Sequence, residues 1–317
     1  MAYVLKEHLA NKSNYGSKRD LAKIEYLAIH YTTNDGDTSE NNGKYFANNV
    51  VKASAHYFVD SDSVTRSVPD NYVAWAVGGN KYNNAGGRLY GIANNTNTLS
   101  IEICDDVKNG VVYPSQATID NVISLAKTKM VEYGLDKAHV IRHYDVNGKP
   151  CPKYWVNEDC WDKEFHSKLV GWALYNDNWY WLDGNGNVVK NTWIQYNQKW
   201  YRLGADGIMF VDKWIQNNSG TWSYVGPNGD ALTGWQQLAW NGVVSWYCFD
   251  FNGNMVKSQW INHNGKDYYV TFSGAMATNC YIKSTTHELY YWVNEHGVWE
   301  PEWNTETPNL TKYQVVV

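Results

Sequence analysis

A short aromatic pattern recurs about six times between residues 171 and 303, and it limits what this half of the chain can fold into. Each unit has a leading aromatic residue, a polar stretch, an aromatic pair or triplet and usually a glycine-centred turn. The leading residues follow one another at intervals of 21, 21, 21, 25 and 21 residues: Trp172, Trp193, Trp214, Trp235, Trp260 and Tyr281. A unit this short cannot bury its apolar face alone, so neighbouring units must stack into an array.

Within a unit, two short aromatic segments surround an Asn/Asp-rich turn, and this arrangement predicts one β-hairpin per unit. Single hairpins are marginally stable in water, so stacking is what lets them fold. We therefore predict an all-β repeat solenoid of aromatic hairpins over residues 169–317. The non-repeating residues 1–168 form a separate domain, which must be analysed for chemistry on its own.

Composition excludes several partners. The net charge of −5 and the pI near 6.0 do not indicate the basic surface that binds the phosphate backbone of nucleic acid. The sequence also has no run of basic residues that would bind an anionic membrane surface. No stretch of 18 apolar residues is present to span a bilayer. The first residues lack an apolar signal core, so we expect synthesis in the cytoplasm without a signal peptide. The five cysteines match no disulfide framework, which favours reduced thiols, and at least one is available to a metal.

The first domain alternates strand and helix signals. Residues 24–32 read as a buried strand that delivers His30 at its end, and residues 55–59, 64–68, 97–104 and 139–143 read as further strands. Apolar residues from Ile119 to Met130 recur at helical spacing, and Gly134 is a natural stop. We predict an α/β domain with a central mixed β-sheet.

Two histidines and a cysteine are the residues most suggestive of chemistry. His143 and Cys151 stand eight residues apart across a loop in which Pro150 and Pro152 restrict the cysteine backbone. With His30, they supply three protein ligands and leave one open tetrahedral position, which is typical of a catalytic zinc. Such a set also occurs by chance, so a proline-bounded loop without metal remains an alternative.

Residues 20–160 resemble the zinc-dependent N-acetylmuramoyl-L-alanine amidases, a group that includes amidase-type phage lysozymes and relatives of the peptidoglycan recognition proteins. The similar segments are Ala28–Thr32, Ser54–Val59, Asn97–Cys104 and Arg142–Pro152, the last of which is the most specific. This resemblance implies His30, His143 and Cys151 as zinc ligands, and Glu102 and Lys149 as catalytic groups.

The expected chemistry suits these residue types. Zinc lowers the pKa of water to roughly 7, and Glu102 can take the water's proton and pass it to the leaving amine. A fixed charge on Lys149 stabilises the oxyanion, a contribution of ~3 kcal/mol per donor. Some family members have a tyrosine where this chain has Ala55. In this chain the catalytic proton transfer would therefore depend on Glu102. The alternatives are a solvated strand residue for Glu102 and a loop charge for Lys149.

Three more residues of this domain have two interpretations each. His56 is either a buried hydrogen-bonding residue or a substrate contact. Trp75 either packs in the core or lines the substrate groove, as a similar segment does in the family. Asp145 is either a competing ligand or, more in keeping with its place in a turn, a supporting group. The Asn/Gly-rich stretch of residues 78–97 is predicted to be an exposed loop that forms the groove wall.

The repeats resemble the choline-binding repeats of pneumococcal and phage lytic enzymes. That resemblance implies a left-handed solenoid whose aromatic boxes hold the choline of teichoic or lipoteichoic acid. Desolvated aromatic faces bind a quaternary ammonium at ~0.5–2 kcal/mol each, and several weak sites gain by multivalency. Any single aromatic could instead fill the core. The predicted walls are Trp172, Trp179, Trp181, Trp193, Trp200, Trp214, Trp222, Tyr224, Trp235, Trp246, Trp260, Tyr269 and Tyr291.

The pattern is imperfect at two positions. Arg202 and Cys248 stand where a third aromatic residue is expected, and the Arg202 cation would repel choline. Not every site between repeats should therefore bind choline, and a glucan or another wall polymer is an alternative ligand. The final unit is atypical, as a terminal cap or a homodimer-forming hairpin would be.

Together these features predict a peptidoglycan hydrolase that cleaves between N-acetylmuramic acid and L-alanine and is held on the bacterial cell wall by its repeats. It would be a phage endolysin or an exported autolysin. The alternatives are a non-catalytic protein that binds peptidoglycan or teichoic acid, and a zinc peptidase that acts within the stem peptide.

Overall fold

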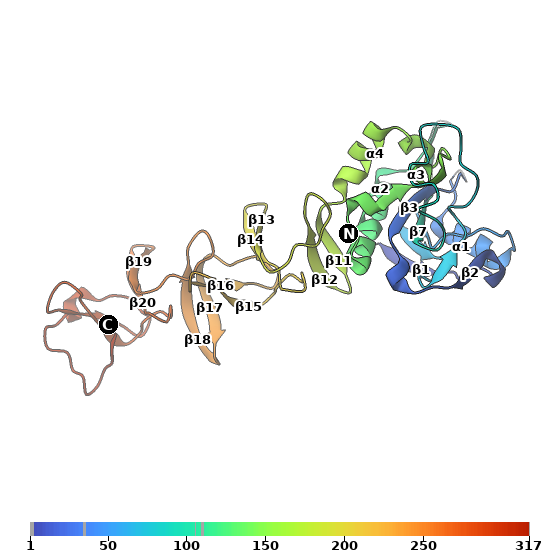
Figure 1. Cartoon of the computed structure of the whole chain (residues 1–317). Helices are drawn as coiled ribbons and strands as arrows, with labels where there is room; N and C mark the ends of the chain where they lie inside the picture. The colour runs from blue at the N-terminus through green and yellow to red at the C-terminus, as the bar shows by residue number, and fades with distance from the viewer. Residues whose placement is uncertain (1–2, 34–35, 105, 109–110, 317) are drawn as a thin grey trace. The chain divides into compact units, whose positions relative to one another are not determined.

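The computed structural model describes residues 3–33, 36–104, 106–108 and 111–316 (Figure 1). The chain divides into two units, Met1–Lys190 and Asn191–Val317, which are treated separately below. Within the described residues, no helix is both long and apolar enough to cross a membrane. The five cysteines, all of which lie in the described part of the chain, form no disulfide with one another.

A six-stranded mixed sheet forms the centre of the first unit and confirms the predicted α/β domain (Figure 1). Neighbouring strands run parallel except for the antiparallel pair β4 and β5. The strand order is β1 (Val4–Glu7), β5 (Ser63–Arg66), β4 (Tyr57–Val59), β7 (Thr98–Ile103), β3 (Tyr26–Tyr31) and β10 (Val140–Arg142).

The long helix α2 (Gln116–Tyr133) packs on this sheet. Its N-terminus is capped by the Ser115 side chain, which accepts from the Thr118 amide, and it ends at Gly134, whose φ of 65° is left-handed. The strand side chains beneath it, such as Leu99 and Ile101, are fully buried. Each such side chain contributes about 1.5–3 kcal/mol to folding. This core fixes the ends of β3 and β7, where the predicted site residues lie.

Smaller elements complete the unit. Two two-stranded sheets join β2 (Tyr15–Lys18) to β6 (Tyr72–Ala74) and β8 (Asp106–Lys108) to β9 (Val111–Tyr113). The short helices are α1 (Ser39–Asn48), α3 (His143–Asn147) and α4 (Glu158–Glu164). Single 3-10 turns are η1 (Lys12–Asn14), η2 (Leu21–Lys23), η3 (Lys137–His139), η4 (Lys153–Trp155), η5 (His166–Lys168) and, in the second unit, η6 (Pro301–Trp303).

The first repeat belongs to this unit. Its strands β11 (Gly171–Tyr175) and β12 (Asn178–Leu182) form a hairpin that packs on α2. Ala173 and Leu182 are part of the same buried cluster as the sheet residues, and the Thr128 hydroxyl of α2 donates to the Leu174 carbonyl at 2.9 Å. The domain boundary predicted at 168/169 therefore marks the start of the repeats, while the contacts of unit one continue beyond it.

The second unit consists of five further antiparallel hairpins, so all six predicted repeats form hairpins. Their strands are β13 (Trp193–Tyr196) with β14 (Lys199–Arg202), β15 (Lys213–Gln216) with β16 (Trp222–Val225), β17 (Gly234–Trp240) with β18 (Val243–Phe249), β19 (Gln259–His263) with β20 (Lys266–Val270), and β21 (Cys280–Lys283) with β22 (Tyr290–Val293). A last strand, β23 (Val315–Val316), pairs in parallel with β21.

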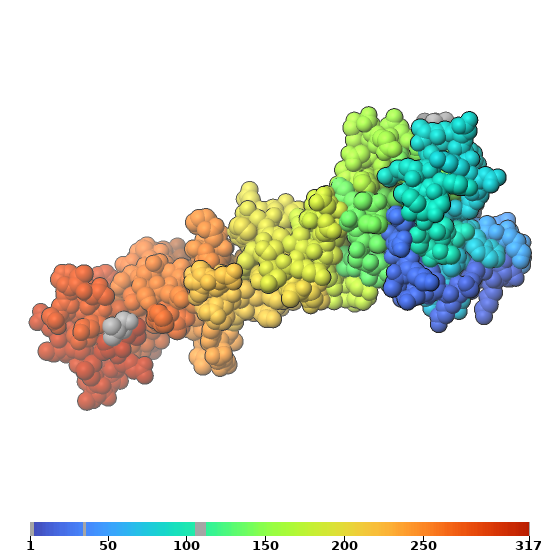
Figure 2. Space-filling view, viewed as in Figure 1, coloured from blue at the N-terminus to red at the C-terminus, as the bar shows by residue number. Residues whose placement is uncertain are grey.

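Successive hairpins lie against one another within this unit (Figure 2). The segment after each of the last four hairpins donates a backbone hydrogen bond to the second strand of the preceding repeat, with N–O distances of 2.6–2.9 Å. The pairs are Ala231 with Trp200, Met255 with Trp222, Met276 with Trp246 and Trp299 with Asp267. These bonds recur once per repeat and confirm the stacked array.

In the last four repeats the turn glycine packs against the residue that closes the previous turn. A Cβ at Gly274, whose φ is 84°, would clash with the Met255 thioether. The first repeat has no preceding turn, and there α2 takes its place: a Cβ at Gly186 would lie 2.6 Å from Met130 Cε and 2.9 Å from Lys137 Cγ. Only glycine fits such a close approach with a positive φ.

Candidate metal centre and substrate groove

His30, His143 and Cys151 meet at one edge of the central sheet. His30 lies near the end of β3, His143 begins α3, and Cys151 follows in the loop after α3. Their ligand atoms all lie within 4.8 Å of one another, and Cys151 Sγ is 3.8 Å from His30 Nδ1. A tetrahedral zinc separates nitrogen and sulfur ligands by roughly 3.5 Å, so the cluster is close to the size that this ion requires.

The chemistry of these donors also fits a metal. Neither ring nitrogen of His143, nor Nε2 of His30, has a hydrogen-bond partner among the described residues, although both side chains are buried. An unsatisfied buried polar atom costs ~1–3 kcal/mol, which a coordinate bond would offset. Burial, with the nearby charge of Lys149, lowers the pKa of His143 to about 4. Burial, followed by the charges of His143 and Lys149, also holds the pKa of His30 well below its ordinary value. Both imidazoles are therefore neutral at pH 7, as metal ligation requires.

Asp145 organises the loop that carries two of these residues. Its carboxylate accepts from the Arg142 backbone amide at 2.8 Å and from the Arg142 guanidinium at 2.8 and 3.0 Å. The same guanidinium donates to the Trp155 carbonyl at 2.8 Å. Burial alone would raise the pKa of Asp145, but Arg142 outweighs it and the pKa is lowered. Asp145 thus has the supporting position, and the clustered thiol is that of Cys151.

Glu102 lies beside the cluster because of strand register. In the parallel pair of β3 and β7, Glu102 is the direct partner of His30. Its Oε1 lies 3.9 Å from His30 Nδ1, and 19% of the side chain is exposed. A carboxylate that is part-buried next to the ligands and still open to solvent is placed to exchange protons with a reacting group.

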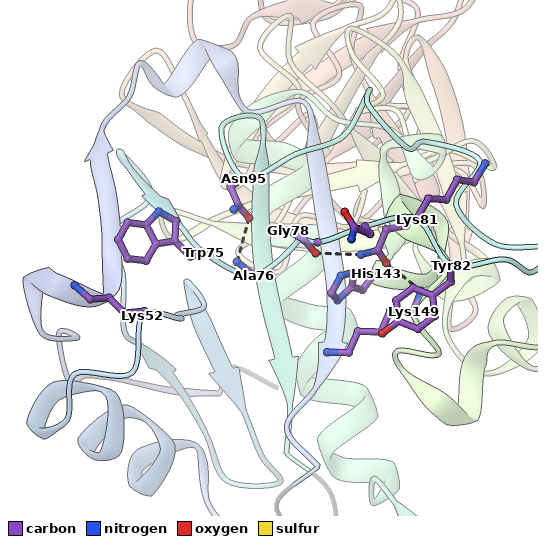
Figure 3. Close-up of a pocket in the computed structure, with 12 residues that line it drawn as sticks. Lys52, Trp75, Ala76, Gly78, Lys81, Tyr82, Asn95, His143 and Lys149 are labelled. Carbon is purple, nitrogen blue, oxygen red and sulfur yellow. Dashed lines mark hydrogen bonds between the residues drawn. The ribbon is translucent and has the colours of Figure 1, made fainter.

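A groove of about 670 Å³ opens next to the cluster (Figure 3). His143, Lys149 and Tyr82 lie together toward one end, and Trp75 and Lys52 lie at the other. The predicted loop of residues 78–97 contributes several lining residues, including Gly78, Lys81 and Asn95. Lys149 is exposed. Trp75 is half-buried and lines the groove, which agrees with the interpretation of Trp75 as a groove residue and not as a core residue.

Asn147 joins the groove wall to the loop that carries His143 and Cys151, and sequence analysis assigned Asn147 no role. Its Nδ2 donates to the Gly78 carbonyl at 3.0 Å, and its Oδ1 accepts from the Lys149 amide at 3.0 Å. Across the same junction, Asn84 Nδ2 donates to the Gly148 carbonyl at 2.7 Å. The only signal in the sequence is the Asn-Gly turn pair at Asn147 and Gly148.

His56 does not line the groove. The side chain is fully buried; its Nδ1 accepts from the Ser100 amide at 3.0 Å, and its Nε2 lies 3.1 Å from the Tyr72 carbonyl. Burial, reinforced by the Arg19 guanidinium 3.0 Å away, lowers the pKa of His56 to about 3. This geometry favours a buried hydrogen-bonding role over the predicted contact with substrate.

In the second unit, register brings together one residue set for each pair of neighbouring repeats, and several of these sets are aromatic boxes. The leading aromatic of a hairpin faces one residue of its second strand, as Trp214 faces Tyr224. The following hairpin adds its central residue, and Trp214 lies 5.0 Å from Tyr247 between ring centroids. Equivalent contacts join Trp235 to Tyr268 at 5.7 Å and Trp260 to Tyr291 at 5.8 Å.

Comparison with known proteins agrees with both halves of this description. Residues 20–154 match the family described as N-acetylmuramoyl-L-alanine amidase. Residues 245–299 match the choline-binding repeat, and residues 170–188 and 191–209 match a related cell wall binding repeat. The match to the amidase family thus falls on the first part of the chain, and the matches to choline-binding and cell wall binding repeats fall on the hairpins that follow.

Its relatives include two N-acetylmuramoyl-L-alanine amidases of Bacillus. CwlA of Bacillus subtilis is 34% identical over 164 residues, which are 51% of this chain and 55% of CwlA. CwlL of Bacillus licheniformis is 30% identical over 154 residues, 47% of this chain and 41% of CwlL. The chain thus spans about half the length of the curated relatives it matches.

Among solved structures, a mutant endolysin from Bacillus subtilis is 25% identical, with a TM-score of 0.41 over 51% of this chain and 97% of that one. Choline binding protein F from Streptococcus pneumoniae is 33% identical, with a TM-score of 0.33 over 41% of this chain and 45% of that one.

The boxes of the choline-binding repeats differ in how open they are. In the box of Trp214, the Trp240 ring lies 4.5 Å from both Trp214 and Trp222 and fills the space between them. By contrast, Trp260, Tyr269 and Tyr291 form three walls, with Trp299 at 6.0 Å from Trp260.

The remaining aromatic residues that were predicted to form box walls differ in exposure and in position. In the first repeat, Trp172 lies 5.1 Å from Trp181 and 6.2 Å from Trp179, which is 43% exposed. Trp246 is similarly exposed, at 41%.

In the last repeat, register places Trp292, and not Tyr291, opposite Tyr281. Tyr291 instead completes the preceding box. Trp193 and Trp200 line a separate pocket, to which Arg202 also contributes.

Proposed function

We propose that this chain hydrolyses the amide bond between N-acetylmuramic acid and L-alanine in peptidoglycan, with a zinc ion held by His30, His143 and Cys151. The observation that carries the proposal is the meeting of these three buried donors beside Glu102, at a groove that Lys149 also lines. When bound, zinc supplies Lewis-acid polarisation and acidifies water.

The residues of the chain have distinct tasks in this reaction. Glu102 accepts a proton from the attacking water and returns it to the leaving amine, because its carboxylate lies 3.9 Å from His30 and is still partly open to solvent. Lys149 stabilises the negative charge that develops on the carbonyl oxygen. Asn147 keeps the Lys149 backbone in place through its bond to the amide, and Trp75 provides an apolar face for the substrate.

Digestion of purified cell walls tests the activity. We expect new L-alanine amino termini, their loss after treatment with a chelator, and their recovery with zinc. Glu102→Gln should retain zinc and lose about 100-fold or more in rate, whereas the exposed Glu25→Gln, a matched change outside the groove, should keep full activity. Amino termini of another stem residue would instead indicate a zinc peptidase, and binding without new termini would indicate a non-catalytic wall-binding protein.

The repeats hold the enzyme on the wall in this proposal. The three-walled box of Trp260, Tyr269 and Tyr291 is suited to the trimethylammonium group of choline on teichoic or lipoteichoic acid, because a cation without hydrogen-bond donors is bound best by aromatic faces. Several such sites on one polymer gain by multivalency. The protein would then act at the cell wall as a phage endolysin or an autolysin.

Retention on an amine-substituted resin and elution by free choline test this part. Trp260→Ala should weaken retention, and the exposed Trp303→Ala should not. Retention that is equal in both variants would count against the box. A homodimer through the last repeat stays a prediction, which sedimentation of the full chain would test.

A further inference from the structure

The box between the second and third hairpins departs from the aromatic pattern at two of its three positions. Trp193 faces Arg202 across the hairpin, where the third and fifth repeats have Tyr224 and Tyr269. The central residue contributed by the following hairpin is Ser223, where later repeats have tyrosine. These changes leave a pocket of about 490 Å³ within the second unit, lined by residues of β13–β14, of β15–β16 and of the turn after β18.

The lining of this pocket is polar but carries no negative charge. Two indoles, Trp193 and Trp200, provide apolar faces, and Arg202 is the one charged residue. The other lining residues, all within the described part of the chain, bear carboxamide or hydroxyl groups. Such groups both donate and accept hydrogen bonds, so they match a ligand that is rich in hydroxyls.

A hydrogen-bond network holds these groups in place without a ligand. The Trp193 indole donates to Asn217 Oδ1 at 2.9 Å, and Asn217 Nδ2 donates to Ser223 Oγ at 3.2 Å. Asn217 Nδ2 also lies 3.5 Å from Asn254 Oδ1. Ser223 is only 2% exposed, so the network reaches from the pocket into the stacked core. Preorganisation of this kind reduces the entropy lost on binding.

Arg202 has an uncompensated charge. Its Nη2 donates to Asn191 Oδ1 at 2.9 Å and its Nη1 donates to the Leu203 carbonyl at 3.1 Å. It forms no salt bridge with any residue that the structure describes, whereas the nearby Lys199 is paired with Asp230 at 2.7 Å. A guanidinium has five N–H donors in a planar fork, so donors remain for a carboxylate or phosphate.

We infer that this pocket binds an anionic sugar unit, a sugar ring that carries a phosphate or a carboxylate. The ring would pack on the indole faces, its hydroxyls would bond to the carboxamides, and the anionic group would pair with Arg202. A quaternary ammonium suits the same pocket poorly, because it has no donors for the amides and is repelled by the arginine. The inference goes beyond the proposed function and does not require that any box binds choline.

Ligand-observed NMR and calorimetry on the full chain test this site with four probes: glucose 1-phosphate, N-acetylmuramic acid, glucose and choline. We expect saturable binding of at least one anionic sugar, with glucose at least tenfold weaker. The phosphate probe represents sugars of a phosphodiester polymer and the carboxylate probe represents the glycan strand, so their relative affinities distinguish the two sources.

Arg202→Gln is compared with Lys213→Gln, which removes the same charge from an exposed position outside the pocket. Arg202→Gln should weaken the anionic sugar at least tenfold and leave choline within twofold, and Lys213→Gln should leave both within twofold. The inference is overturned if neither anionic sugar binds, if glucose binds equally well, or if Arg202→Gln has no effect. Because the glucose arm uses the unaltered protein, the result does not depend on the folding of a variant.

Discussion

The two units of this chain assemble their sites in different ways. In the first unit, His30, Glu102, His143 and Cys151 come from distant segments and meet through sheet register and one loop. In the second, each box is made by residues of adjacent hairpins, and the same arrangement recurs along the sequence. Loss of one residue should therefore abolish function in the first unit, whereas it alters one site among several in the second.

The largest effect is expected at the metal cluster. Cys151→Ala leaves two imidazoles, which should lower zinc content and reduce the rate of wall digestion by more than about 100-fold. Cys160→Ala, outside the cluster, should leave both unchanged. Metal analysis and release of L-alanine termini measure the two quantities, and full activity in a metal-free Cys151→Ala protein would rule out the proposed centre.

Shortening the chain tests where the first unit ends. A protein ending at Lys168 lacks Leu169, Ala173 and Leu182, all of which belong to the main buried cluster. We expect its free energy of unfolding to be lower by ~3–5 kcal/mol than that of a protein ending at Lys190, because the loss resembles a large truncation in a core. Thermal unfolding compares the two; equal midpoints would show that the first hairpin is dispensable.

His56 should make stability depend on pH. In the unfolded chain it takes up a proton near pH 6.5, but in the folded state it stays neutral down to about pH 3. Stability from this group is therefore complete above pH 6.5 and falls by ~1.4 kcal/mol per pH unit between those values. Urea unfolding at pH 7 and pH 5 should show a decrease in stability to which His56 contributes ~2 kcal/mol, so the decrease should be smaller by about that amount in His56→Gln. An identical decrease in both proteins would assign the effect to other groups.

The smallest effect should come from opening a filled box. Trp240→Ala removes the indole between Trp214 and Trp222 and leaves aromatic walls around a vacant space. We expect calorimetry to show one additional choline per chain, bound with the ~0.5–2 kcal/mol per face that such walls provide. Trp303→Ala, which is exposed, should leave the stoichiometry unchanged. No gain in Trp240→Ala would show that the walls collapse without the indole.

The sequence predicted those structural features best that have a local residue pattern, such as repeat spacing or alternation of apolar residues. The repeat spacing predicted all six hairpins, and alternation of apolar residues in residues 97–104 placed Glu102 on the correct strand. Arg202 and Cys248 were recognised as exceptions, and register places both opposite leading tryptophans.

Tertiary contacts had no such signal. Trp240 fills a box because the fourth repeat, four residues longer than most, has seven-residue strands, and the spacing alone did not show where the extra indole would point. The Asn147 bridge depends on Gly78, 69 residues away in sequence, which only the folded structure brings close. The burial of His56 depends likewise on Arg19 and Tyr72, which are distant in sequence.

The contact of Gly186 with Met130 has a consequence for how such a chain could change in length. Because α2 supplies the surface on which the first turn stacks, the array already has a built-in starting face and needs no separate cap there. Insertion or deletion of whole hairpins after Lys190 would leave that face and the buried core of the first unit intact. Exchange of the first hairpin would instead require a matching change in α2. The number of later hairpins can therefore vary while the junction between α2 and the first hairpin stays the same.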